Sequence, residues 1–282
     1  MNPSDSISEN KKNNVYSLVR QYSKSSILLS KANIFSLLTR KGTLFELEAA
    51  LHELQNDNVL SCCEGGLYFA SESREYFQNG NFVPSSVKLE KVKATLNFLA
   101  KISTIRFIGI TGSSTFEMVE NKDDVDIFVI VQKHTLFITR LTIFVVTFIF
   151  GNFRTRKSKK TKDTVCTNVI LEEENLKVPY PKRNLFSARE LTQILSFYDK
   201  ERMLDKLKDA NSEWFYDLLP NQEHKSKHSL YQEKNSRGEI FLPWINSILA
   251  FFQLWYMKSK VTNELISLKQ LWLHPNTRHK FN

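Results

Sequence analysis

Cysteine is scarce in this sequence, with 3 residues among 282, and two of them, Cys62 and Cys63, are adjacent. The third, Cys166, stands alone, so the sequence has no CxxC pair and no evenly spaced set of cysteines. This absence excludes a disulfide-rich fold and the usual spacing of a structural zinc site. It also indicates a reducing compartment, and we therefore expect a cytoplasmic protein.

A secretory signal and a long apolar run are also missing. Residues 1–14 are polar and lack the apolar core of a signal peptide. As a helix, residues 136–150 would cover roughly 22 Å, less than a hydrocarbon core of about 30 Å, and polar residues interrupt the borderline stretch 240–257. We predict that 136–150 is buried in the domain. The alternative is a peripheral contact with the inner membrane face through 136–162 and 240–257, because a basic cluster ends the first segment.

Other common catalytic patterns are absent as well. The sequence around Ser113 is not G-x-S-x-G, so a serine hydrolase has no support. His224 and His228 lie in a polar segment without a third ligand, which argues against zinc. Acidic residues are outnumbered, with 39 Lys and Arg against 30 Asp and Glu, for a net charge of +9. This excess favours anionic partners, such as nucleotides, nucleic acid or an anionic membrane face.

The composition that is present, 41% hydrophobic and 24% charged, is typical of a globular protein. We expect a disordered tail over 1–14, a winged-helix-like domain over 15–85, an α/β domain over 86–180, and a helical C-terminal region over 181–282 with a linker at 221–238. In the last region we predict two helices, the first beginning at a capping box of Ser187 and Glu190.

The order of elements near the N-terminus is typical of a winged helix. Two helical patterns come first, and Thr43 is the expected N-cap of the second. Two short β-type runs follow, on either side of Gly65 and Gly66. The second helical segment is acidic and carries no Lys or Arg, whereas phosphate binding needs cations. Nucleic acid is therefore a weakly supported partner.

One stretch, "TGSSTFEMVENKDDVDIFVIV", combines a glycine turn with a pair of carboxylates. A buried strand over 105–111 is predicted to end at Gly112 and Ser113, followed by one short helix. Backbone N–H groups at such a turn, together with a helix dipole, suit a phosphate. Gly112 and Ser113 are therefore candidates for nucleotide binding.

Asp124 and Asp126 flank Val125 at the start of a second apolar strand. Alternate residues of a strand share a face, so both carboxylates are expected to point the same way. Unpaired carboxylates on an interior strand are costly, and a hard cation such as Mg²⁺ would compensate for them. The alternative is a solvated polar turn before the strand.

Together, "TGSS" and "DDVDIFVIV" resemble the signature of the nucleotidyltransferase superfamily that includes DNA polymerase beta and the minimal nucleotidyltransferases. The flanking text is similar to uncharacterised prokaryotic proteins with this domain, in "LFITRL", "VCTNVIL", "NLFSARELTQI", "ANSEWFYDLLPN" and "LHPN". The resemblance implies an α+β fold with an N-terminal winged helix, a mixed sheet flanked by helices at 86–180, and a helical C-terminal region.

The resemblance also implies a Mg²⁺-dependent transfer of a nucleotidyl group from an NTP to a hydroxyl acceptor. Asp124 and Asp126 would be the catalytic ligands of two metal ions, while Gly112 and Ser113 would bind the nucleotide phosphates.

A third carboxylate on a later strand is usual in that superfamily. The expected strand "TVCTNVIL" contains none, and Asn168 and Glu172 are the candidates to complete the site. Because a general base is not evident, the alternative is a catalytically inactive nucleotide-binding or regulatory module.

Overall fold

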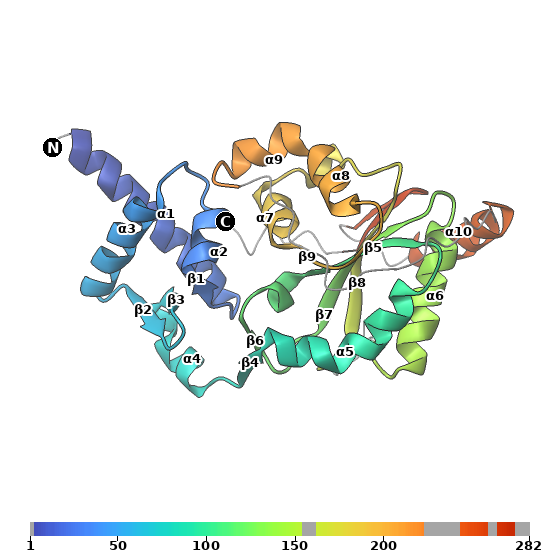
Figure 1. Ribbon diagram of the computed structural model, residues 1–282, viewed down its shortest axis with the longest axis horizontal. Helices are drawn as coiled ribbons and strands as arrows, with labels where there is room; N and C mark the ends of the chain where they lie inside the picture. Colours follow the sequence, from blue (N-terminus) through green and yellow to red (C-terminus); the bar gives the residue numbers. More distant parts are fainter. Residues whose placement is uncertain (1–2, 154–161, 223–242, 259–263, 274–282) are drawn as a thin grey trace.

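The computed structural model describes residues 3–153, 162–222, 243–258 and 264–273, which form an α+β protein. Within these residues a three-stranded sheet lies in the N-terminal third, a six-stranded sheet forms the centre, and a two-stranded ribbon connects them (Figure 1). The α+β class expected from the sequence is therefore confirmed.

The N-terminal unit consists of three helices and a small antiparallel sheet of order β1-β3-β2. Its elements are α1 (Pro3–Lys24), β1 (Leu29–Ser30), α2 (Lys31–Leu37), α3 (Leu44–Asn56), β2 (Leu60–Cys63) and β3 (Leu67–Ala70). The hydroxyl of Thr43 accepts a hydrogen bond from the Glu46 amide, and the Glu46 carboxylate accepts one from the Thr43 amide, which confirms the predicted N-cap. Gly65 and Gly66 have positive φ angles of 86° and 72°, as the tight turn between β2 and β3 requires.

The N-terminal tail differs from the prediction. Residues 3–14 belong to α1, so the expected disorder of residues 1–14 is wrong from Pro3 onward. Lys11 forms an ion pair with Glu46, and Lys12 with Asp57, both on or next to α3. The same helix continues into the buried Val15. The polar sequence is ordered because it extends a buried helix and meets carboxylates that are distant in the sequence.

The central sheet has the strand order β10-β11-β8-β7-β5-β9. Strand β7 pairs antiparallel with β5 and parallel with β8, so the sheet is mixed, as expected. Every residue of β5 is buried, which confirms the interior strand predicted there. The strands are β5 (Ile105–Thr111), β7 (Val125–Val131), β8 (Val165–Glu172), β9 (Leu195–Asp199), β10 (Leu265–Ile266) and β11 (Gln270–Trp272).

The C-terminal region is not simply helical. Strands β9, β10 and β11 come from residues 181–282 and form both edges of the central sheet. The central sheet therefore extends beyond the domain predicted over 86–180. These strands have two to five residues, too few for a hydrophobic period to be recognised between helical segments. In addition, α7 is capped by Asn184, which accepts from the Ser187 amide, and not by the predicted capping box at Ser187.

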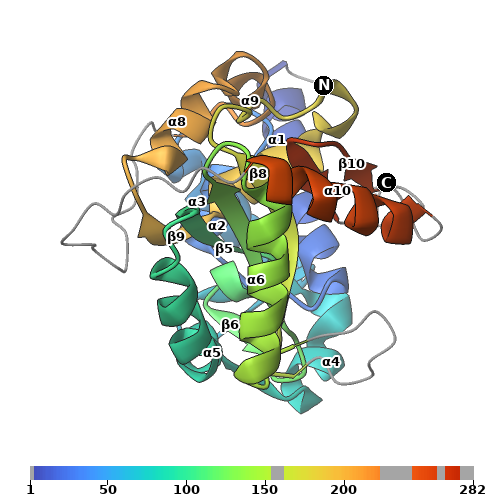
Figure 2. The same cartoon turned by 90° about the vertical axis from the view of Figure 1, so that its right-hand side faces the viewer.

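Helices cover both faces of the central sheet (Figure 2). On one face the buried cluster includes Val92, Ile143 and Ala250, and on the other it includes Leu191 and Leu207. The first face is covered by α5 (Ser85–Ala100), α6 (Leu136–Ile149) and α10 (Pro243–Lys258), and the second by α7 (Leu185–Gln193), α8 (Met203–Asp209) and α9 (Ser212–Leu218).

The N-terminal unit is joined to the centre by a ribbon and by side-chain contacts. After α4 (Arg74–Asn79), β4 (Phe82–Pro84) pairs with β6 (Met118–Glu120), which directly follows the glycine turn. Phe116 packs edge-on against Tyr22 of α1, with ring centroids 5.6 Å apart. The turn that begins at Gly112 is therefore held between the two units.

Helix α6 buries one face of the apolar stretch 136–150, with Phe137 and Ile143 under the sheet, but Phe148 and Ile149 on the other face are 67% and 72% exposed. The predicted burial of this stretch therefore holds for one face only. Among the described helices, none is long and apolar enough to cross a membrane. Most of the basic cluster (154–161), most of the predicted linker (223–238), and with it His224 and His228, lie outside the described residues.

Candidate metal-binding site

The chain turns sharply where β5 ends. Gly112 has a φ of +68°, in the left-handed region that favours glycine. The turn forms a short 3₁₀ helix, Gly112–Thr115, and the chain then enters β6, so the short helix expected after the turn is a 3₁₀ helix and not an α-helix. A phosphate at this turn would meet backbone amides, without the dipole of an α-helix.

Gly112 lies directly against the carboxylate of Asp126. A methyl group placed on its Cα would overlap the Oδ2 atom of Asp126. Thr111, just before it, is the antiparallel partner of Asp126 in the β5–β7 pair. Both the backbone conformation and the close approach therefore require glycine at position 112.

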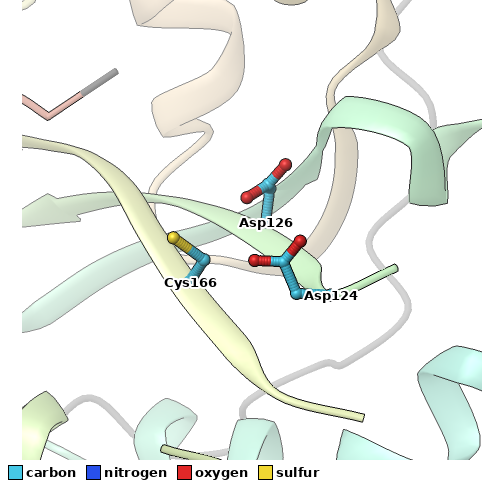
Figure 3. Close-up of side chains that lie close together, drawn as sticks. All are labelled: Asp124, Asp126 and Cys166. Atoms are coloured by element: carbon cyan, nitrogen blue, oxygen red, sulfur yellow. The ribbon is translucent and has the colours of Figure 1, made fainter. Parts of the chain in front are cut away.

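The two predicted carboxylates come together at the entrance of β7. Asp124 immediately precedes the strand and Asp126 is its second residue, so they flank the buried Val125. A carboxylate oxygen of each lies within 4.8 Å of the other and of the Cys166 sulfur (Figure 3). All three side chains are partly exposed.

Cys166 is the member of this cluster that the sequence analysis missed. It is the second residue of β8 and the parallel partner of Asp126. The sequence predicts strand β8 but not its register against β7. This register brings the Cys166 sulfur to the carboxylates of Asp124 and Asp126. A search for donors at the first positions of each expected strand would have included Cys166.

The two residues proposed to complete the site lie in different places. Asn168 is close, because its Oδ1 accepts a hydrogen bond from the Cys166 thiol at 3.5 Å. Glu172 is paired with Val131 at the opposite end of β7, and its carboxylate accepts from the His134 amide at 2.9 Å. Burial raises the pKa of Glu172. The prediction that Glu172 joins the site is wrong, since it lies six residues along the strand from Cys166.

Ser113 contacts a further carboxylate that was not predicted as a site residue. Its hydroxyl donates to the Oδ2 of Asp123 at 2.9 Å. Burial raises the pKa of Asp123, and the hydrogen bond from Ser113 partly offsets this effect. The Ser113 hydroxyl is thus oriented by the acidic segment that also carries Asp124 and Asp126.

A buried lysine lies beside this acidic end of the sheet. Lys88 of α5 is 0% exposed, and its ammonium donates to the Asn121 carbonyl at 2.9 Å and to Asp163 at 3.3 Å. Lys91 also pairs with Asp163, at 3.3 Å. Asp163, just before β8, is engaged with these two cations and is not a member of the cluster of Asp124, Asp126 and Cys166.

The arrangement offers two carboxylate oxygens and one sulfur to a single cation, beside a turn of backbone amides. Carboxylates beside such a turn suit a divalent ion and a phosphate group together. Comparison of the chain with protein-family models, with curated proteins and with solved structures finds no match.

Proposed function

We propose that this protein is a metal-dependent nucleotidyltransferase that moves a nucleotidyl group from an NTP to a hydroxyl-bearing acceptor. The observation that carries the proposal is the contact between the Gly112 turn and the Asp126 carboxylate, with Asp124 beside it. This contact joins the two parts of the sequence signature in one place, so a phosphate at the turn would be within reach of an ion on the carboxylates.

Asp124 and Asp126 would hold the ion, and the amides around Gly112 and Ser113 would bind the nucleotide phosphates. Magnesium is the ion that the resemblance implies, and the two carboxylates fit its preference for oxygen ligands. Bound there, one or two such ions would neutralise charge on the reacting phosphate. The chain's own contribution is to orient the triphosphate.

The fold supports the same proposal. The order α1, β1, α2, α3, β2, β3 with its small sheet supports a winged helix, and the mixed sheet around β5, β7 and β8 supports a nucleotidyltransferase fold. Glu46 and Glu48 of α3 form ion pairs with Lys11 and Lys31. Because these lysines already face carboxylates, we propose that this unit contacts protein and not nucleic acid.

The test uses the purified full chain with a divalent cation and each of the four labelled NTPs. Pyrophosphate release and label transfer are measured for the wild type, for Asp124→Asn/Asp126→Asn, and for Glu174→Gln as a matched control on an exposed carboxylate. We expect the rate of the double variant to fall at least about 100-fold. Removing a residue that only hydrogen-bonds to a metal ligand costs about 10- to 100-fold, and removing the ligands themselves should cost more. Equal rates in all three proteins would contradict the proposal.

A second candidate is an inactive nucleotide-binding or regulatory module. The cluster found in the described residues contains two carboxylates and a thiol, and no third carboxylate that would serve as a general base. Metal-dependent nucleotide binding that disappears in the Asp124→Asn/Asp126→Asn variant, without pyrophosphate release from any NTP, would support this candidate over the transferase.

Exposed apolar side chains favour an additional role at a membrane surface. Phe148 of α6 is 67% exposed and Trp255 of α10 is 73% exposed. The two helices pack on each other, since Asn246 accepts from the Phe137 amide at 2.8 Å and Gln253 donates to the Phe137 carbonyl at 2.9 Å (Figure 2). The exposed residues at helical spacing are Leu141, Phe144, Val145 and Phe148 on α6, and Trp244, Ile248, Phe251, Phe252, Trp255 and Tyr256 on α10.

We propose that an anionic lipid surface covers these two apolar stripes. Neither helix contains an acidic residue, and α10 ends in a cation, Lys258. Exposed Trp and Tyr side chains suit the headgroup region, and cations suit anionic lipid heads. A second copy of this chain carries the same net charge of +9, so it offers this surface no charge complementarity.

Flotation with neutral and with anionic phospholipid vesicles tests this surface. We expect binding to anionic vesicles that Phe148→Asp/Trp255→Asp abolishes and that Phe45→Asp, at an 80% exposed site on α3, leaves intact. Light scattering without vesicles is the companion measurement. A dimer that the same double variant dissociates, with no vesicle binding, would refute the membrane proposal.

A further inference from the structure

The third donor of the cluster is sulfur, which magnesium does not favour. Asp124 and Asp126 offer oxygen, whereas Cys166 offers a thiol within 4.8 Å of both. Magnesium takes carboxylates, water and phosphates, while thiolates prefer softer transition-metal ions. The two carboxylates therefore fit Mg²⁺, but the complete set of three donors does not.

A buried hydroxyl on the same face of the sheet also points to a ligand here. Thr111 is 3% exposed, and its Oγ1 has no hydrogen-bond partner within the described residues. Thr111 is paired directly with Asp126 across β5 and β7, and Asp126 is paired with Cys166 across β7 and β8. Directly paired residues lie on one face of a sheet, so the three side chains form a row. An unpartnered buried hydroxyl is costly, and a metal ion or its bound water would satisfy it.

The neighbour of the thiol suits a metal-bound sulfur as well. Cys166 donates its S–H to the Oδ1 of Asn168 at 3.5 Å. When the thiol binds a metal it loses its proton to solvent, and the amide of Asn168 can turn its N–H₂ group toward the thiolate. Asn168 is buried, so this amide is held close to the sulfur in either orientation. Such a partner orients a metal ligand and stabilises its charge.

We infer that the site binds a thiophilic divalent ion, of the class of Co²⁺ or Zn²⁺, through Asp124, Asp126 and the thiolate of Cys166, in preference to Mg²⁺. This inference rests on the proposed function, because it concerns the ion of the same site. It assigns Cys166 as the residue that sets the metal preference, and Asn168 as a positioning residue for its sulfur.

The experiment titrates the full chain with Co²⁺ and follows the thiolate-to-cobalt charge-transfer absorption, a readout that does not depend on turnover. The proteins are the wild type, Cys166→Ser, and Cys62→Ser/Cys63→Ser as a control for the two exposed cysteines. Calorimetric titrations with Co²⁺ and Mg²⁺ give both affinities, and thermal unfolding checks that each variant is folded.

We expect the charge-transfer band in the wild type and in Cys62→Ser/Cys63→Ser, and its loss in Cys166→Ser. Co²⁺ affinity should fall at least about tenfold in Cys166→Ser, because removing a residue that only hydrogen-bonds to a metal ligand already costs about that much. Mg²⁺ affinity should change little. Co²⁺ binding of equal affinity without the band would overturn the inference and leave the proposed function standing. Absence of any divalent binding in the wild type would overturn both.

Discussion

Replacing Gly112 by alanine tests the contact on which the site depends. Gly112 adopts a φ of +68°, and an added methyl group would overlap the Oδ2 atom of Asp126. The left-handed conformation costs a non-glycine residue about 1–2 kcal/mol, and forcing a methyl group into a packed contact costs about 1–3 kcal/mol more. We therefore expect Gly112→Ala to lower the free energy of unfolding by about 2–5 kcal/mol.

Gly151 supplies a matched control, because it has a φ of +71° and no atom within 4 Å of an added Cβ. Gly151→Ala should lose only the backbone term, about 1–2 kcal/mol. Equilibrium urea unfolding compares the two variants, and the difference between them isolates the displacement of Asp126. Divalent-metal titration should show weakened binding in Gly112→Ala and unchanged binding in Gly151→Ala. Equal destabilisation of the two variants, with metal binding intact in both, would refute the importance of this contact.

Three further substitutions test the packing and the electrostatics around the sheet. Asn246→Ala removes the acceptor for two backbone amides at the start of α6 and should lower the free energy of unfolding by about 1–2 kcal/mol in urea unfolding. Asn211→Ala removes hydrogen bonds to Val178, Leu176 and Leu207 and should cost about 3 kcal/mol in the same assay. Burial raises the pKa of Glu172 above its ordinary 4.5, so the folded protein favours the protonated carboxyl. The stability that Glu172 contributes is therefore full below pH 4.5 and is lost as pH rises through the raised pKa. The stability of Glu172→Gln relative to the wild type should accordingly increase from pH 4.5 upward, and a pH-independent difference would contradict this assignment.

The parts of the fold that could be predicted are those that depend on residues close together in the sequence. The largely apolar sequence of β5 and the Thr43 cap of α3 depend on neighbours within a few positions, and both are confirmed. Strand β9, in contrast, is buried by pairing with β5, far away in the sequence. Its five residues contain no period of their own, so the helical interpretation of that region was wrong there.

In the candidate site, too, the residues set by local sequence could be predicted, and those set by strand pairing could not. Asp124 and Asp126 share a face because they lie two positions apart in the chain, which alternation predicts. Cys166 joins them through the register of a parallel pair, and this register depends on a bulge near Thr167 and on packing that no local pattern encodes. Glu172 was a plausible carboxylate by type, but the direction of β8 carries it to the far end of the sheet.

The strand order of the central sheet has a consequence for synthesis on the ribosome. A chain emerges N-terminal end first, so all strands of the small sheet are available once β3, Leu67–Ala70, has left the exit tunnel. Strand β5 gains its second neighbour only when β9, Leu195–Asp199, appears, and β8 waits for β11, Gln270–Trp272. Until then the nascent sheet has two open, apolar edges. Chaperones bind such edges, and without chaperones the edges of neighbouring chains can pair wrongly with one another. Premature release before β11 should therefore yield an aggregation-prone product, even though every carboxylate and thiol of the cluster has already been made.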